Sequence, residues 1–185
     1  MVATNNIKLD LMEFNKLVRT QLFPILQKYG FEIVEEFKNI VRFQSSVMKV
    51  NVVFNNYDKS HLVEIGKRGE ALYSLNDNAV KELFSSELSI EQVTSEIFVQ
   101  NLSLLFKQQK GVEILKGSIE PLDNFIKLQS EHYTSELVKR QALEAASKAW
   151  KANDYITFVK SIDKIGIDKI PQSYLLKYKI AMQKL

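Results

Sequence analysis

The strongest pattern of apolar and polar positions lies between residues 31 and 66. Four runs rich in β-branched and aromatic residues follow one another there with short polar breaks, at residues 31–37, 40–44, 47–54 and 61–66. In the third run, polar Lys49 and Asn51 alternate with apolar residues, which is typical of a strand with one buried face. The apolar positions of that run are Met48, Val50, Val52 and Phe54. Because connections this short allow only antiparallel neighbours, the pattern predicts a four-stranded antiparallel meander.

A helical pattern precedes the strands. Apolar residues recur at helical spacing up to Tyr29, with Asp10 placed to cap the helix and Gly30 placed to end it. Pro24 lies inside this pattern, where it removes a backbone hydrogen bond and clashes with the preceding turn. We therefore expect the helix to kink or restart near Phe23.

Two capping boxes predict further helices after the strands. Ser74 with Asp77 opens a short helix, and Ser89 with Gln92 opens a longer one that Gly111 ends. The longer helix carries a wide apolar stripe, which needs a partner surface. The bare face of the sheet is the natural candidate.

The pattern after Gly117 and Ser118 is helical throughout. We expect a long helix over 122–150 and a last one that begins at Pro171. Between them, Asn153-Asp154 breaks and recaps the chain, and a short helix follows that ends at Gly166. The chain as a whole is thus predicted to be α+β, with an N-terminal helix, a four-stranded antiparallel meander covered by helices, and an all-helical C-terminal part.

The Gly117-Ser118 step is also the predicted domain boundary. It divides an α+β body, residues 1–117, from a helical tail, residues 118–185. The tail is expected either to fold separately or to pack with the body as one unit.

The composition fits a folded protein and removes several kinds of site. Of the 185 residues, 45% are hydrophobic and 25% are charged, which is a globular balance. The absence of cysteine excludes disulfides, thiolate zinc sites and cysteine nucleophiles, and it fits a reducing compartment. No apolar run approaches the roughly eighteen residues that a membrane span requires. We expect a cytoplasmic protein that uses neither a membrane nor a cofactor.

Charge is distributed unevenly along the chain. Residues 139–185 hold ten Lys and Arg against four Asp and Glu, whereas the preceding residues hold fifteen against eighteen. A basic segment can meet an acidic protein surface or phosphate groups. The lysines of the tail interleave with apolar helix positions, so they are expected on outer faces. The lysines predicted to contact a partner are Lys148, Lys151, Lys160 and Lys164.

A second basic candidate is the glycine-flanked loop 66–69. Two glycines there enclose Lys67 and Arg68, which could present charge and backbone N–H groups to an anion. The loop lacks the spacing and the terminal Lys-Ser/Thr of a phosphate-binding loop. Lys67 and Arg68 are therefore candidate ligands of a simple anion.

The two histidines are the other candidates for chemistry. His61 lies near Asp58 and Glu64, carboxylates that would draw it toward its charged form and could make it a general base. His132 and Glu136 have the spacing that places both on one helix face, which could supply half of a metal site. Neither stands in a recognisable catalytic or metal-binding frame. No catalytic, metal-binding or cofactor-binding residue is predicted, and an enzyme is the weaker class.

Nucleic acid is a further possible partner of the basic tail. Aromatic residues lie among its lysines, as a base-stacking platform would require: Tyr155, Phe158, Tyr174 and Tyr178. They also hold the helical periods of a core, and Arg140 is the tail's single arginine, although arginine is the main reader of bases.

Two resemblances add expectations to this pattern. The spaced residues Ala142, Ala146, Trp150, Asp154 and Tyr155, followed by Tyr174, Tyr178 and Ala181, resemble one tetratricopeptide-type helical hairpin. That resemblance implies helix-pair packing and partner binding, but the glycine between the helices is absent and no site residue is carried over.

The first hundred residues are similar, in the order of their residue types, to small bacterial proteins of immunity type. The segments that carry this similarity are Leu22-Phe23-Pro24, Gly30-Phe31, the strand meander and Tyr57-Asp58. It implies a protein that neutralises or tethers another protein. We therefore expect a non-enzymatic protein-binding module, immunity-like or adaptor; a small enzyme or a nucleic-acid-binding protein that uses the basic tail is the alternative.

Overall fold

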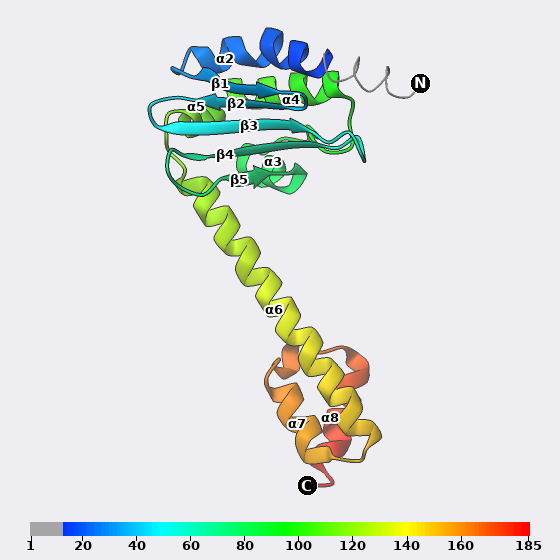
Figure 1. The fold of residues 1–185 in the computed structure, drawn as a ribbon. Coiled ribbons are helices and arrows are strands. Elements are labelled where there is room, and N and C mark those ends of the chain that lie inside the picture. Colours follow the sequence, from blue (N-terminus) through cyan, green and yellow to red (C-terminus); the bar gives the residue numbers. More distant parts are fainter. Residues whose placement is uncertain (1–12) are drawn as a thin grey trace, which may run out of the picture. The chain divides into compact units, whose positions relative to one another are not determined.

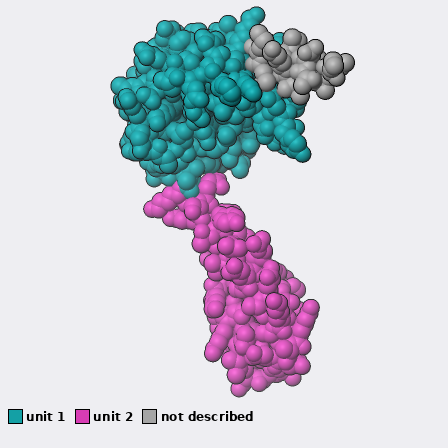
Figure 2. All heavy atoms as spheres, viewed as in Figure 1, with its two compact units in different colours: residues 1–126 teal, residues 127–185 magenta. Residues whose placement is uncertain are grey.

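The computed structural model describes residues 13–185. The chain forms two compact units, Met1–Ile126 and Lys127–Leu185 (Figure 2), which are described separately below. The division lies within one helix and falls after the Gly117-Ser118 step. Whether residues 1–117 and 118–185 fold as independent domains stays a prediction.

The first unit contains one antiparallel sheet in which each strand pairs with the next along the chain (Figure 1). The strands are β1 (Glu32–Phe37), β2 (Ile40–Gln44), β3 (Met48–Phe54), β4 (His61–Lys67) and β5 (Tyr73–Leu75). The predicted α+β class, N-terminal helix, antiparallel meander and helical C-terminal part are confirmed. The fifth strand was not predicted, because its three residues are too few to show an alternation.

The sheet buries one face only. Its buried apolar side chains are Val41, Phe43, Met48, Val50, Val52, Phe54, Val63, Ile65 and Leu75. On the opposite face, the register aligns Arg42, Asn51 and Glu64 in one row across β2, β3 and β4. The alternation predicted for β3 is therefore confirmed, and helices gather on the buried face (Figure 1).

The N-terminal helical segment changes its winding before the proline. Residues 13–17 are helical, η1 (Val18–Leu22) is a π-helical turn, and α2 (Phe23–Gln27) follows. The N–H of Phe23 bonds to the carbonyl of Val18, which makes the turn wider than an α-helical one. This wider turn accommodates Pro24, which has no N–H to donate, at the start of α2. The predicted restart near Phe23 is confirmed, whereas the predicted cap Asp10 lies outside the described residues.

Both predicted capping boxes are wrong. Ser74 lies in β5, and α3 (Asp77–Phe84) is capped by Asn76, whose side chain accepts from the Ala79 N–H. α4 (Ser95–Lys107) begins after Thr94, which caps Ile97. The hydroxyl of Ser89 instead donates to the carboxylate of Asp77. The tertiary contact between these two segments uses the polar groups that local capping would have needed.

Gly111 does not end the helix that precedes it. α4 already ends at Lys107, and Gly111 lies inside α5 (Gln109–Leu115). A Cβ atom on Gly111 would overlap the carbonyl oxygen of Leu105 and lie 2.7 Å from the Cα of Phe106. Gly111 therefore allows the backbone of α5 to touch the end of α4.

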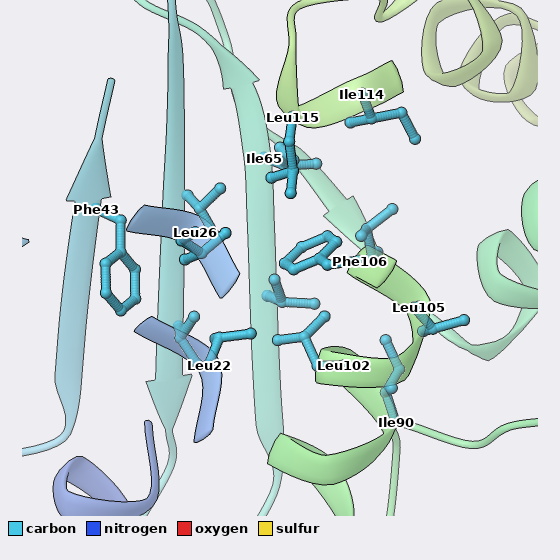
Figure 3. Packing of buried hydrophobic residues seen from close by; sticks show 14 of the residues in the cluster. Leu22, Leu26, Phe43, Ile65, Ile90, Leu102, Leu105, Phe106, Ile114 and Leu115 are labelled. Atoms are coloured by element: carbon cyan, nitrogen blue, oxygen red, sulfur yellow. The ribbon is translucent and has the colours of Figure 1, made fainter. Parts of the chain in front are cut away.

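One core joins these helices to the sheet. Leu22 and Leu26 of the N-terminal segment and Phe106 of α4 converge on the buried face of the strands (Figure 3). Each of these three side chains is fully buried. The wide apolar stripe that was predicted to cover the sheet joins the same core, although its first residues, Ile90 and Val93, lie in the segment before α4.

The second unit is entirely helical in structure. α6 (Glu120–Lys151) begins in the first unit and ends in the second, where α7 (Tyr155–Asp163), η2 (Ile167–Lys169) and α8 (Gln172–Met182) follow. Its core consists of Ala146, Ala149, Phe158, Val159, Ile162 and Ala181. Ala146 and Ala149 of α6 are small, which allows the neighbouring helices to approach α6 closely. Asp154 caps α7 through the N–H of Thr157.

Candidate functional site

A concavity of the first unit surrounds His61. Two adjoining pockets of about 940 and 860 Å³ share Ser60, His61, Gln92 and Val93 in their walls. The β3–β4 loop, the start of β4 and the segment before α4 bring these residues together. A concavity with several polar groups and a perturbed titratable residue is the usual place to look for a site.

His61 is buried among aromatic rings. It lies opposite Phe54 in the register of β3 and β4, so its side chain enters the core and is only 8% exposed. The centroids of the Phe98, Phe54 and Phe14 rings are 4.6, 5.1 and 5.9 Å from that of the imidazole. Burial lowers the pKa of His61 to about 4, because an apolar environment disfavours the charged ring. The predicted shift toward the charged form is wrong.

The carboxylates expected near His61 do not converge on it. Glu64 points to the opposite face of the sheet, where it accepts a 3.0 Å hydrogen bond from the Asn51 amide. Asp58 lines one of the pockets, but its carboxylate accepts hydrogen bonds from the backbone N–H and the hydroxyl of Ser60. These hydrogen bonds lower the pKa of Asp58. Neither of these two carboxylates therefore orients the imidazole.

Ser95 is the partner that sequence reasoning missed. Its Oγ lies 3.0 Å from Nε2 of His61, a distance that suits a serine nucleophile and its base. Nδ1 of His61 has no hydrogen-bond partner among the described residues. No local motif marks Ser95, since the pair joins positions thirty-four residues apart that meet only through the packing of α4 on the sheet.

The tautomer of His61 decides whether this pair is reactive. If Nε2 accepted from Ser95, Nδ1 would carry a buried proton with no acceptor, which is a rare and costly arrangement. If Nε2 donates to Ser95, Nδ1 is an unprotonated acceptor without a donor, so no buried N–H lacks an acceptor. The second tautomer is favoured, and it leaves the Ser95 hydroxyl without a base.

We expect a fluorophosphonate probe to leave Ser95 unlabelled at neutral pH, because the hydroxyl is not deprotonated by His61. Intact-mass spectrometry of the treated protein measures this, with Ser95→Ala as the matched control. Labelling of the native chain that disappears in both Ser95→Ala and His61→Phe would contradict it and identify a reactive dyad.

The second histidine does not belong to a group of potential metal ligands among the described residues. His132 is exposed on α6, and Glu136 forms a 3.7 Å ion pair with Lys139. Within residues 13–185, no group of three or more His, Asp or Glu side chains could hold a metal ion. The half site predicted from their spacing therefore finds no further ligands in the part of the chain that the structure describes.

Lys67 and Arg68 lie at the end of β4 and in the turn that follows it. The Arg68 side chain is exposed and Lys67 is half-buried. The backbone N–H of Arg68 bonds to the carbonyl of Val47 at 2.7 Å, so that donor is not free for an anion. Anion binding by the two side chains stays a prediction.

The four lysines proposed to meet a partner are all exposed. Lys148 and Lys151 lie at the end of α6, Lys160 lies in α7, and Lys164 follows α7. The predicted position on outer helix faces is confirmed for Lys148, Lys151 and Lys160, and Lys164 is exposed just after the end of α7. The role of all four in binding stays a prediction.

The four aromatic residues considered for base stacking pack within the second unit. Phe158 is fully buried and stacks on Tyr174, with ring centroids 6.4 Å apart. The ammonium of Lys177 lies 5.3 Å from the ring of Tyr174, and that of Lys184 lies 5.6 Å from the ring of Tyr155. The tyrosine rings are partly buried against the core and in contact with lysines, which disfavours a base-stacking platform.

Comparison of the chain with protein-family models, with curated proteins and with solved structures finds no match. Across residues 13–185, no helix combines the length and the apolar character that crossing a bilayer would need.

Proposed function

We propose that this protein is a non-enzymatic protein-binding module, an adaptor or a bacterial immunity-like protein, whose second unit binds an acidic protein. The observation that carries the proposal is the exposure of Lys148, Lys151, Lys160 and Lys164 on a unit with excess positive charge. The absence of cysteine suits a reducing compartment, so we assign this binding to the cytoplasm.

The charge of the second unit supports an acidic partner. Residues 127–185 hold eleven Lys and Arg against six Asp and Glu, while residues 1–126 hold fourteen against sixteen. Exposed charges of one sign contribute little to stability but accelerate encounter with a surface of the opposite sign. This acceleration fades as the screening length shortens to about 10 Å near 0.1 M salt.

Reversal of Lys148, Lys151, Lys160 and Lys164 to glutamate is expected to slow association with the captured partner by at least about tenfold at low salt, with the melting temperature nearly unchanged. The partner is first identified by affinity capture with the native chain and mass spectrometry. Surface plasmon resonance at several salt concentrations then measures the association rate.

A matched control reverses the same amount of charge elsewhere. Lys28, Lys107, Lys110 and Lys116 are exposed lysines of the first unit. Their replacement by glutamate should leave the association rate within about threefold of the native value, since the altered charges lie outside the binding unit. Equal slowing by both variants would refute a specific basic surface, and the open sheet face around Lys49, Asn51 and Asn55 would be tested next.

A small enzyme is the second candidate, favoured by the distance between Ser95 and His61. The unpartnered Nδ1 of His61 counts against it, and the fluorophosphonate experiment separates the two functions. Nucleic acid in place of a captured protein, removed by nuclease, would favour the remaining alternative.

A further inference from the structure

We infer that a lysine-lined hollow in the second unit binds the dianion of a phosphate monoester. The hollow has a volume of about 490 Å³ and is formed by α6 and the segment that follows α7. Lys139 comes from α6, whereas Lys164 and Lys169 come from the other wall. All three lie within Lys127–Leu185, so one compact unit builds the site.

The charge of the hollow matches a dianion. Three lysines face it, and Glu136 is the one carboxylate among the described residues of its wall. These side chains sum to about two positive charges, and a phosphate monoester carries about −1.5 to −2 at neutral pH. A single carboxylate ligand would leave one positive charge uncompensated.

Glu136 does not neutralise the lysines by itself. Its ion pair with Lys139 is long, at 3.7 Å, and the two side chains are 56% and 36% exposed. An exposed pair of this kind is weak, so exchange of Glu136 for a more highly charged anion costs little. Asp163 lies beside Lys164 in the sequence, but its carboxylate accepts a 2.8 Å hydrogen bond from the Tyr178 hydroxyl.

The kinds of donor in the wall also favour phosphate. Lysine binds phosphate as a compact point charge, whereas arginine is the residue that grips a planar carboxylate through two parallel bonds. The hydroxyl-bearing residues Thr134 and Ser135 line the same hollow and can add neutral donors. The Thr134 hydroxyl currently donates to the carbonyl of Ser130, at 2.8 Å.

The hollow shares Lys164 with the proposed partner surface, but it can be tested separately, with the purified chain and small anions. Inorganic phosphate and phenyl phosphate are titrated at constant ionic strength while backbone amide shifts are recorded by NMR. We expect saturable shifts confined to residues 134–139 and 164–169. Phenyl phosphate tests a monoester directly, and a phosphoserine peptide with its unphosphorylated form tests whether a protein could supply the group.

Charge-matched variants decide whether the hollow is specific. The triple variant K139Q/K164Q/K169Q should weaken phosphate binding by at least about tenfold, since it removes all three cations from the wall. The triple variant K127Q/K179Q/K184Q removes the same net charge from exposed positions of the same unit outside the hollow and should bind within about twofold of the native chain. Equal loss in both variants, or shifts that never saturate, would overturn the inference.

A test on the native chain needs no variant. The second pKa of a phosphate monoester is about 6, so its affinity should fall as the pH decreases from about 7.5 to 5 and the dianion gains a proton. Sulfate remains a dianion over this range and should bind with little change. A phosphate affinity that does not respond to pH would contradict recognition of the dianion, whatever the behaviour of the variants.

Discussion

Replacement of Gly111 by alanine is expected to lower the free energy of unfolding of the first unit by about 2–3 kcal/mol. Alanine is the better helix former by up to about 1 kcal/mol, so propensity alone predicts a gain. The added Cβ, however, would overlap the carbonyl oxygen of Leu105 and lie 2.7 Å from Cα of Phe106. Both atoms belong to the backbone and cannot rotate away, so the clash outweighs the propensity.

Urea unfolding followed by two probes measures this effect. Circular dichroism reports on all helices and strands, whereas Trp150, the single tryptophan, reports on the core of the second unit. We expect Gly111→Ala to shift the dichroism transition of the first unit and to leave the tryptophan transition near its native midpoint.

Gly69→Ala serves as the matched control for the clash. Gly69 has a positive φ of 87° but no atom within 4 Å of an added Cβ, so its replacement should cost only about 1 kcal/mol of backbone strain. A Gly111→Ala protein as stable as the native one would mean that α5 does not touch the end of α4 as closely as the structure indicates.

The free energy of unfolding should fall by up to ~3 kcal/mol as the pH decreases from about 6.5 to 4, through His61 alone. The folded protein holds His61 neutral, with a pKa of about 4, whereas the unfolded chain takes up a proton near the ordinary value of 6.5. Between these two values the unfolded state binds more protons, so acid favours unfolding. Above about pH 6.5 His61 is neutral in both states and the protein is at its most stable with respect to this residue. The stability declines as the pH decreases from about 6.5 to 4.

His61→Phe should remove this pH dependence. Phenylalanine can occupy the space among Phe14, Phe54 and Phe98 and has no proton to gain, at the cost of the Ser95 hydrogen bond. We expect the variant to be within about 1 kcal/mol of the native protein at neutral pH and more stable than it near pH 4.5.

The histidine on the surface provides the control. His132 is exposed on α6, and His132→Gln should keep the native decline between about pH 6.5 and 4. Urea unfolding at each pH measures all three proteins, and subtraction of the His61→Phe curve removes the contribution of the carboxylates. A His61→Phe protein that loses stability as steeply as the native one would contradict the buried, neutral imidazole.

Local sequence determined the elements whose signals are complete within a few residues. The alternation of Met48, Val50, Val52 and Phe54 was sufficient to identify β3 and its buried face, because a strand places successive side chains on opposite sides. The short connections made the sheet antiparallel, and Pro24 required a restart that the structure achieves with a π turn. Asp154 and Pro171 marked helix starts in the same local way.

Only the tertiary structure decided what depends on residues far apart in the sequence. Ser89 could have capped a helix, but it bonds to Asp77 because the two segments pack together, and the cap passes to Thr94. β5 exists because β4 offers it an edge to pair with.

The candidate sites depend on tertiary contacts as well. His61 has an acidic neighbourhood in the sequence, yet the register opposite Phe54 turns it into the core, away from Glu64 and toward Ser95. The lysine hollow likewise brings Lys139 of α6 near Lys169, which lies beyond α7, and no sequence spacing predicts that proximity. Periodicity determines which face of a helix or strand is apolar. The groups that face a given side chain are determined by packing between elements distant in sequence. The chemistry of a site depends on those neighbouring groups, so the sequence alone does not reveal it.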